Sequence, residues 1–536
     1  MEFYRHAVAP VFSGCPDDRF WKELVTQVSF QEAAVRHAVV AISTLYETIK
    51  DGQVISLRSP KGRFAISHYN RALQQLAKTD DVGMVLFVNI LFICIEVLQE
   101  NKQAAINHCR HGVAVFNSRG RGFDWARDNL MPVFARLSIF PFFFGSSVDT
   151  FPQLSYGTEI DLTAPLHSLD EARTSLDVLI SKCIRFIRST DAYRVGSLHN
   201  QPIPERLRSD QQELIPILDG WIEQFAAFQE ANPPATETFG LYSMMRMKAL
   251  VAKIWTEASL ERTETVYDGY QSMFDELVDL AGHVIASDAV KPGWTAKPRF
   301  IFDMGFLPLL YFVVIKCRNL RSQVLALEHM RALSVNRENL WDSALMFSIG
   351  WRVIEREHGI TQEEARRRVF DQQQLSSLDG DEQPAVFALP PDEMRIYESM
   401  NMHDTEMRLD PRSGRMMPHR KVTYIYRGAT TGELSFPTEW VAIQPIDPSY
   451  QPPQSQLNAV GASVTTPSTV CSSVEKPQST YNSGNASSVS GSSNYLMTPP
   501  RDESVGGYSD WDVDVVDVDI DLNEWIEDGS LLFTGA

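Results

Sequence analysis

Two histidines and a cysteine, which are side chains that commonly bind metal ions, lie close together at His108, Cys109 and His111. On a helix His108 and His111 share a face, because residues three apart are neighbours there. A structural zinc ion needs a closed tetrahedral set of four ligands. The sequence offers no fourth ligand nearby. We therefore interpret the segment as part of an ordinary buried helix and predict no metal site.

A second candidate for chemistry is the acidic pair in DELVD, where Asp275 and Asp279 lie one helical turn apart. It resembles the magnesium-diphosphate motif of the all-helical terpene synthases. That family needs a second metal motif, and DVLISKCIR supplies Asp177 and Ser181 but has Arg185 where an acid is required. No G-x-S-x-G, H-E-x-x-H or glycine-rich phosphate loop is present. We predict no enzyme, no catalytic residue and no cofactor, and keep a magnesium-dependent diphosphate-processing enzyme as a remote alternative.

The C-terminal segment combines acidic and aromatic residues in a pattern that favours protein binding. From Asp502 to Ala536 it has eleven carboxylates and neither Lys nor Arg, so −11 of the formal net charge of −19 lies there. Acids alternating with bulky apolar residues are typical of disordered activation segments. Such segments place a few aromatic and aliphatic anchors in a partner's groove. We predict that this one binds a coactivator or the transcription machinery. The predicted anchors are Trp511, Val515, Val518, Leu522, Trp525, Ile526, Leu531, Leu532 and Phe533.

Two other interpretations of this tail compete with partner binding. A merely solubilising acidic tail would not need two tryptophans and the apolar run SLLF. A calcium loop would place acids at its positions 1, 3 and 5, then a Gly and a final Glu. Asp510, Asp512 and Asp514 fit this pattern, but Val515 takes the glycine position and Asp521 the last one. The sequence favours a partner-binding segment over both.

The elements that precede the tail are predominantly helical. Residues 82–98 are almost wholly apolar, but Asn89 and Glu96 interrupt the run, which is shorter than the roughly 20 residues that a membrane span needs. The run therefore predicts a buried helix, which pairs across a short turn with an antiparallel helix at 102–116. Helical spacing of apolar residues also predicts helices at about 29–50, 64–78, 168–188, 211–229, 241–254, 267–286, 308–318, 341–358 and 361–374.

These patterns divide the chain into four predicted parts. Residues 1–375 form an all-α array of paired antiparallel helices. Residues 395–445 alternate apolar and polar side chains, which predicts a small β-meander at about 400–443 packed on the helices. Residues 446–500 are rich in Ser, Thr and Pro and should be a disordered linker. Residues 501–536 are the activation segment.

The composition excludes several partners. The six cysteines are scattered singly, so the sequence has neither the cysteine spacing of a zinc cluster nor that of a redox dithiol. Outside the tail the charge is about −8, which supports no nucleic-acid surface, because phosphate binding needs clustered Lys and Arg. The N-terminus has no signal-peptide pattern. We expect neither direct DNA contact through this chain nor membrane insertion.

Several stretches together resemble the fungal-specific transcription factor regulatory domain, the helical region of binuclear zinc-cluster regulators. They are EAAVRHAVVAISTLYE, YNRALQQL, ILFICIEVLQENKQAAINHCRHGVAVF and FIFDMGFLPLLYFVVIKCRN followed by LWDSALM. In the last and most specific tract, Asp303, Pro308, Lys316 and Arg318 have family-like spacing. The resemblance covers residues from about 17 to 357. It implies a helical regulatory domain in a nuclear transcription regulator, without catalytic residues.

One part of the family's pattern is missing. Such regulators usually begin with six closely spaced cysteines that read DNA, whereas residues 1–30 hold only Cys15. Either the sequence starts too late or the protein acts without a DNA contact of its own. We predict a nuclear regulator of RNA polymerase II genes, whose body associates with a second copy, a related chain or a small effector. The alternative is a non-DNA-binding protein that bridges or titrates a related regulator.

Overall fold

The computed structural model describes the chain up to Ile446 apart from short gaps, and all described residues belong to one compact unit. The described ranges are 1–12, 19–53, 55–56, 58–119, 124–155, 161–162, 164–289, 297–376, 387–428 and 432–446. The predicted linker beyond Ile446 and the predicted activation segment, with all nine anchors, lie outside them. The division of the chain into four parts stays a prediction.

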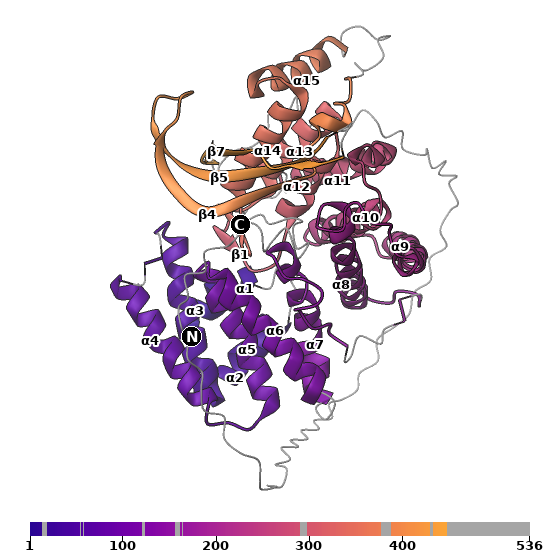
Figure 1. The fold of residues 1–536 in the computed structure, drawn as a ribbon. Coiled ribbons are helices and arrows are strands. Elements are labelled where there is room, and N and C mark those ends of the chain that lie inside the picture. Colours follow the sequence, from indigo (N-terminus) through magenta and orange to yellow (C-terminus); the bar gives the residue numbers. More distant parts are fainter. Residues whose placement is uncertain are drawn as a thin grey trace, which may run out of the picture. The chain divides into compact units, whose positions relative to one another are not determined.

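The described residues form fifteen α-helices and a small sheet region, so the predicted fold class, largely all-α with a small sheet, is confirmed (Figure 1). In the N-terminal half the helices are α1 (Ala9–Phe12), α2 (Val25–Gln31), α3 (Ala33–Lys50), α4 (Pro60–Leu76), α5 (Val82–Leu98), α6 (Lys102–Arg119), α7 (Asp124–Leu137) and α8 (Leu169–Arg194). The others are α9 (Glu205–Ala231), α10 (Phe239–Ala258), α11 (Gln271–Ala289), α12 (Phe306–Lys316), α13 (Leu320–Leu333), α14 (Ser343–His358) and α15 (Gln362–Ser376).

The long apolar run of the sequence is the buried helix α5. The side chain of Asp81 caps its start by accepting hydrogen bonds from the backbone N–H groups of Gly83 and Met84, at 2.9 and 3.2 Å. Every residue from Ile90 to Leu98 is buried. A three-residue turn then leads into α6, which packs against α5 as the predicted hairpin requires. Among the described helices, none is both long enough and apolar enough to cross a membrane.

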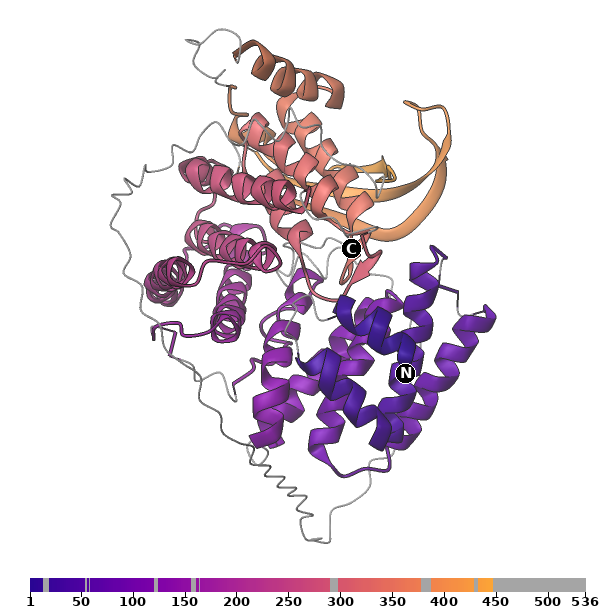
Figure 2. The same cartoon turned by 180° about the vertical axis from the view of Figure 1, so that it is seen from behind.

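Helices α8, α9 and α10 enclose a small apolar cluster of their own beside the main core (Figures 1 and 2). Its centre is Trp221 of α9, which stacks on Phe225 at 4.9 Å between ring centroids. The indole N–H of Trp221 donates to Ser175 Oγ of α8 at 3.0 Å, so its burial leaves no polar atom unpaired. The main cluster takes in the N-terminal helices, α11 to α15 and one face of the sheet.

The sheet lies where the sequence predicts a β-meander, and its long β4–β5 hairpin is drawn in orange in Figure 1. Strands β4 (Glu398–Leu409) and β5 (Met416–Arg427) pair antiparallel. The other edge of β5 pairs with β6 (Leu434–Ser435) and β7 (Thr438–Ala442) in one continuous register. These two are a single third strand interrupted at Phe436 and Pro437, because proline has no N–H to donate to the ladder.

A second, very short sheet joins segments near the start of α12. Strand β1 (Phe300–Ile301) pairs in parallel with β2 (Arg337–Glu338), and β2 pairs antiparallel with β3 (Trp341–Asp342). The sequence patterns did not predict these two-residue strands, which are too short to show alternation. They bring Glu338 to the first turn of α12.

The start of α3 differs from its predicted form. Ser29 and Glu32 have the spacing of a capping box, which would make Ser29 the first cap of one helix. In the structure Ser29 lies inside α2, and its hydroxyl donates to the Thr26 carbonyl at 2.6 Å. Glu32 adopts an extended conformation between α2 and α3 and makes no side-chain cap. The chain therefore forms two helices with a bend between them.

Candidate functional site: an apolar cavity between three helices

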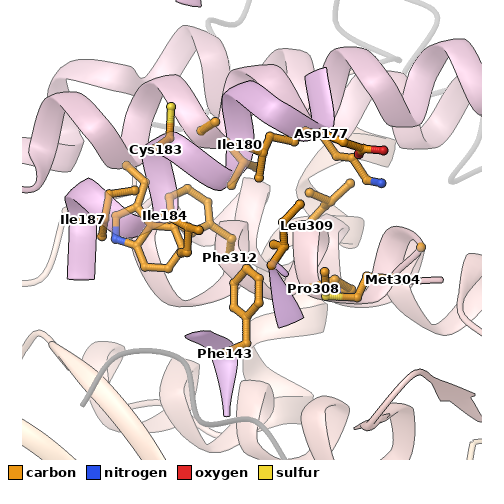
Figure 3. Close-up of a pocket in the computed structure, with 16 residues that line it drawn as sticks. Phe143, Asp177, Ile180, Cys183, Ile184, Ile187, Met304, Pro308, Leu309 and Phe312 are labelled. Atoms are coloured by element: carbon orange, nitrogen blue, oxygen red, sulfur yellow. The ribbon is translucent and has the colours of Figure 1, made fainter. Parts of the chain in front are cut away.

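A partly open cavity of about 80 Å³ lies between α8, α10 and α12 (Figure 3). It forms where the two apolar clusters meet: Cys183 and Ala252 belong to the smaller cluster, and Leu309 and Phe312 to the larger one. Figure 3 shows isoleucines of α8 on one side and Leu309 and Phe312 of α12 on the other. Of its sixteen lining residues, only Asp177 and Lys248 carry a charge. The walls are therefore almost wholly apolar.

Helical spacing explains how the two charged residues reach an apolar cavity. On α8, Asp177 precedes Ile180, Ile184 and Ile187 at intervals of three and four residues, so all four share a face. On α10, Lys248 stands in the same relation to Ala252 and Trp255. Each charge therefore occupies one position of a stripe that is otherwise apolar.

Asp177 and Lys248 form the polar end of the cavity. They attract one another electrostatically, but in the described part of the chain no direct ion pair joins them, and Lys248 has no hydrogen bond to a described residue. Burial raises the pKa of Asp177, and nearby Lys248 and Arg136 oppose that shift. Burial likewise lowers the pKa of Lys248, against the attraction of Asp177. Two groups of opposite charge thus line the same cavity without a direct ion pair between them.

A fixed ion-pair group borders this end. Asp303 accepts a hydrogen bond from Arg173 at 2.9 Å and another from Arg136 at 3.3 Å. Arg136 also lies 3.8 Å from Asp177, between Nε and Oδ2. Asp303 belongs to the tract with family-like spacing, and its role in the structure is to hold the arginines of α7 and α8. Asp303 thereby holds the guanidinium of Arg136 beside the carboxylate of Asp177.

The start of α12 forms another part of the cavity's border. Glu338 accepts hydrogen bonds from the backbone N–H groups of Gly305 and Leu307, at 2.9 and 3.0 Å. A carboxylate is favourable there, because the N-terminal N–H groups of a helix are otherwise unpaired and carry partial positive charge. Gly305 is needed for this approach, since a Cβ would lie 3.0 Å from the carboxylate oxygen. Burial raises the pKa of Glu338 to about 7.

The cavity offers binding rather than covalent chemistry. Its one thiol is Cys183, and burial raises the pKa of that thiol to about 12, so it stays protonated near neutral pH. Thiolate, not thiol, is the reactive form. Groups of three or more metal-binding side chains do not occur among the described residues. The lining can enclose the apolar part of a small molecule and form hydrogen bonds to one polar group of that molecule.

The opposite end of α12 enters a cluster of buried charges, which we call the Glu264 cluster. Glu264 begins the 3-10 helix Glu264–Tyr270 and is fully buried. Its carboxylate pairs with Arg194 of α8, with Lys316 at 3.2 Å and with Arg318 at 2.9 Å. Arg318 also pairs with Glu357 of α14 at 3.2 Å. These five residues are the cluster.

The Glu264 cluster also fixes the chain that leads into the sheet. Lys316 donates to the Tyr397 carbonyl at 2.7 Å, and Arg318 to the Ile396 carbonyl at 2.9 Å. Burial alone would raise the pKa of Glu264, but the three cations outweigh it and hold that pKa below its usual value. Helix α12 thus runs from the cavity to the attachment point of the sheet.

Two of the tract residues singled out in the sequence, Lys316 and Arg318, are therefore structural members of this cluster. The acidic pair of DELVD is placed differently. Asp275 accepts hydrogen bonds from Gln271 and from Ser322 of α13, both at 2.8 Å. In the other half of the candidate motif, Arg185 donates to the Phe151 carbonyl at 2.9 Å and the Val148 carbonyl at 3.3 Å. These contacts give both segments a packing role.

The histidine and cysteine candidates are also engaged separately. His108 Nε2 lies 3.0 Å from the hydroxyl of Tyr69, and Cys109 donates to the Leu137 carbonyl at 3.1 Å. Burial lowers the pKa of His108 to about 4, so it is neutral near pH 7. His108 and Cys109 thus have separate protein partners, whereas His111 lies at an exposed position, so the helix is half-buried and not fully buried as predicted.

Sequence reasoning missed the cavity. The available signal was a single charge inside an apolar helical stripe, at Asp177 and again at Lys248. In the sequence Asp177 belongs to the incomplete metal motif DVLISKCIR, and Lys248 belongs to no motif. No periodicity shows that two such positions on separate helices will face each other, because that depends on how α8, α10 and α12 pack.

Comparison with known proteins gives two positive findings. A family model described as the fungal specific transcription factor domain matches residues 1–291, more than half of the 536 residues. The aspercryptin biosynthesis cluster-specific transcription regulator atnN of Emericella nidulans is 23% identical over 219 residues, which are 37% of this chain and 35% of that protein. The match thus spans about a third of the relative's length. No solved structure matches the chain.

Proposed function

Since the chain belongs to the fungal-specific transcription factor domain family, we propose that it is a transcription regulator acting in the nucleus on genes read by RNA polymerase II. In this proposal the described helices form the regulatory body, and the acidic tail is the activation segment. The family match over residues 1–291 is the observation that carries the proposal. The similarity to a cluster-specific transcription regulator adds to it.

The tail supports an activating role by its composition. From Asp502 to Ala536 there are eleven carboxylates and no Lys or Arg, and the apolar residues among them include Trp511 and Trp525. The acids keep such a segment soluble, while the aromatic side chains supply the apolar area that a coactivator groove can bury. The proposed partners are therefore a coactivator or the transcription machinery.

A fusion experiment tests the tail. Residues 500–536 are attached to a heterologous DNA-binding domain, and reporter expression is measured. We expect activation that falls at least several-fold on combined Trp511→Ala and Trp525→Ala substitution, because both proposed aromatic anchors are lost. Asn523→Ala, in the same segment but outside the anchor set, is the matched control. An inactive fusion, or one indifferent to loss of both tryptophans, contradicts the activating role.

A second candidate function is a regulator that binds related regulators instead of DNA. One observation favours it: outside the tail the formal charge is about −8, whereas a DNA-binding surface needs an excess of Lys and Arg. Crosslinking to DNA, compared with co-purification of a zinc-cluster regulator from nuclear extract, separates the two. DNA crosslinks formed by the purified chain would eliminate the second candidate.

A further inference from the structure

The cavity between α8, α10 and α12 has the features of a small-molecule site. Its volume of about 80 Å³ is roughly half that of an engineered apolar cavity of about 150 Å³ that holds benzene. It is partly open, so a bound molecule can extend beyond it. Walls built from Ile180, Ile184, Leu309 and Phe312 suit a short aliphatic body, because burying it removes apolar surface from water.

The charges around the polar end are close to balance, with Glu338, whose pKa is about 7, partly ionised at neutral pH. Three carboxylates and three cations interact there, and each has named partners or neighbours across the site. The six are Asp177, Asp303, Glu338, Arg136, Arg173 and Lys248. A bound ion would upset this balance in a largely apolar environment, where an uncompensated charge is costly. A neutral head group avoids that cost.

The polar end also sets the hydrogen bonding of the head group. Lys248 can only donate, and an ionised Asp177 can only accept. Because no direct ion pair joins them in the described part of the chain, a group placed between them must accept from the ammonium and donate to the carboxylate. A primary amide or an alcohol does both.

We propose that this cavity binds a small aliphatic molecule whose uncharged head group both accepts and donates hydrogen bonds, with the head between Lys248 and Asp177 and the chain against α8 and α12. Calling this molecule an effector rests on the proposed function, whereas the binding itself rests on the cavity alone. Its route to the rest of the protein is α12, which contributes Leu309 and Phe312 to the cavity and Lys316 to the Glu264 cluster.

Binding is tested on the full chain with hexanamide as the probe. The methyl group of Met304, which lines the cavity, serves as the reporter in a methyl NMR titration and is assigned by Met304→Leu. We expect a saturable shift of this signal with hexanamide. Hexanoate and hexylammonium, which have the same chain but a charged head, should bind at least tenfold more weakly.

Variants connect the signal to the site. Lys248→Met removes a charged donor and Asp177→Asn replaces a charged acceptor with a weaker neutral one, so hexanamide should bind at least tenfold more weakly to Lys248→Met and also more weakly to Asp177→Asn. Ala252→Leu fills the cavity without changing a charge and should abolish the shift. The matched control is Lys253→Met, on the same helix, because Lys253 pairs with Asp219 and Glu257 outside the cavity. Thermal unfolding confirms that each variant is folded.

Several outcomes would overturn the proposal. They are an unmoved Met304 signal, as expected if only water enters the cavity; equal or tighter binding of either charged probe; and full affinity in Lys248→Met or Ala252→Leu. The tail-fusion assay does not involve the cavity, so the two results are independent. If hexanamide binds but the tail fusion is inactive, the binding site is supported and the activating role is not. If the tail fusion is active but hexanamide does not bind, the activating role is supported and the binding site is not.

Discussion

Helix α12 links two regions that treat buried charge in opposite ways. In the Glu264 cluster the charges are in direct contact: Lys316 Nζ has three acceptors within 3.2 Å, namely both oxygens of Glu264 and the Tyr397 carbonyl. Arg194 and Lys316 also lie over the ring of Tyr267, at 5.7 and 5.2 Å from its centroid. At the cavity, Lys248 and Asp177 both contribute to the lining, and in the described part of the chain no direct ion pair joins them. The first arrangement holds the sheet in place, and the second leaves room for another molecule.

The largest loss of stability is expected from a substitution at Glu264. Glu264→Gln removes the carboxylate shared by Arg194, Lys316 and Arg318 and leaves their charges buried together. Losing one member of a buried ion group costs about 3–5 kcal/mol of unfolding free energy. Denaturant unfolding measures the loss. Glu276→Gln is the control, because Glu276 pairs with Arg246 on a partly exposed face and its loss should cost less than about 1 kcal/mol. Equal losses in the two variants would mean that Glu264 is not structural.

The same substitution, Lys to Met, made once in the Glu264 cluster and once at the cavity, sharpens the comparison. Lys316→Met should cost about 2 kcal/mol, because it deletes hydrogen bonds to a charged group and to the Tyr397 carbonyl. Lys248→Met should change stability by less than about 1 kcal/mol, since it removes a partly buried charge that no direct ion pair compensates. The midpoints of denaturant unfolding, measured side by side, give both values. If Lys248→Met lost more unfolding free energy than Lys316→Met, the structural role would belong to the cavity and not to the Glu264 cluster, which contradicts the comparison.

The fold was largely predictable because most of its helices are amphipathic or wholly apolar. Helices α3, α5, α9, α10 and α14 lie where spacing placed them: α5 has the predicted bounds, and the ends of the other four differ from the prediction by at most six residues. Helices α7 and α13 were not predicted. Pro132 inside α7 argues against a helix, and α13 buries Gln323, Glu328 and His329 together with its apolar residues, so it shows no polar face. Tertiary packing decides both.

The sites were less predictable than the fold. The spacing of Lys316 and Arg318 indicated that they matter, but their role depends on Glu264, which lies more than fifty residues earlier. The cavity depends on three helices meeting with a gap between them, which is a property of packing and not of any one segment. The predicted anchors of the tail lie outside the described residues, so their role stays a prediction.

Next to the Glu264 cluster, the folded protein keeps His358 uncharged, and this makes its stability sensitive to acidic pH. His358 Nε2 lies 2.7 Å from Gln323 Oε1, and Gln323 in turn donates to Glu357. Burial, followed by the charges of Arg318, Arg368 and Arg395, lowers the pKa of His358 from 6.5 to about 4. The folded state therefore binds fewer protons than the unfolded state between these values. The stability that His358 contributes is present above pH 6.5 and is lost as the pH falls toward 4.

From pH 7.5 to 5.5 this loss should be about 1 kcal/mol, the smallest of the three effects. His108 and His329, whose pKa values burial also lowers to about 4, act in the same direction, so the contribution of His358 has to be isolated by substitution. His358→Gln should lose less stability over this interval than the unmodified protein, as measured by urea unfolding at both pH values. His167→Gln, at an exposed position, should behave like the unmodified protein. If His358→Gln keeps the full pH dependence, the pKa of His358 is not lowered by folding, and the proposed link between acidic pH and this region fails.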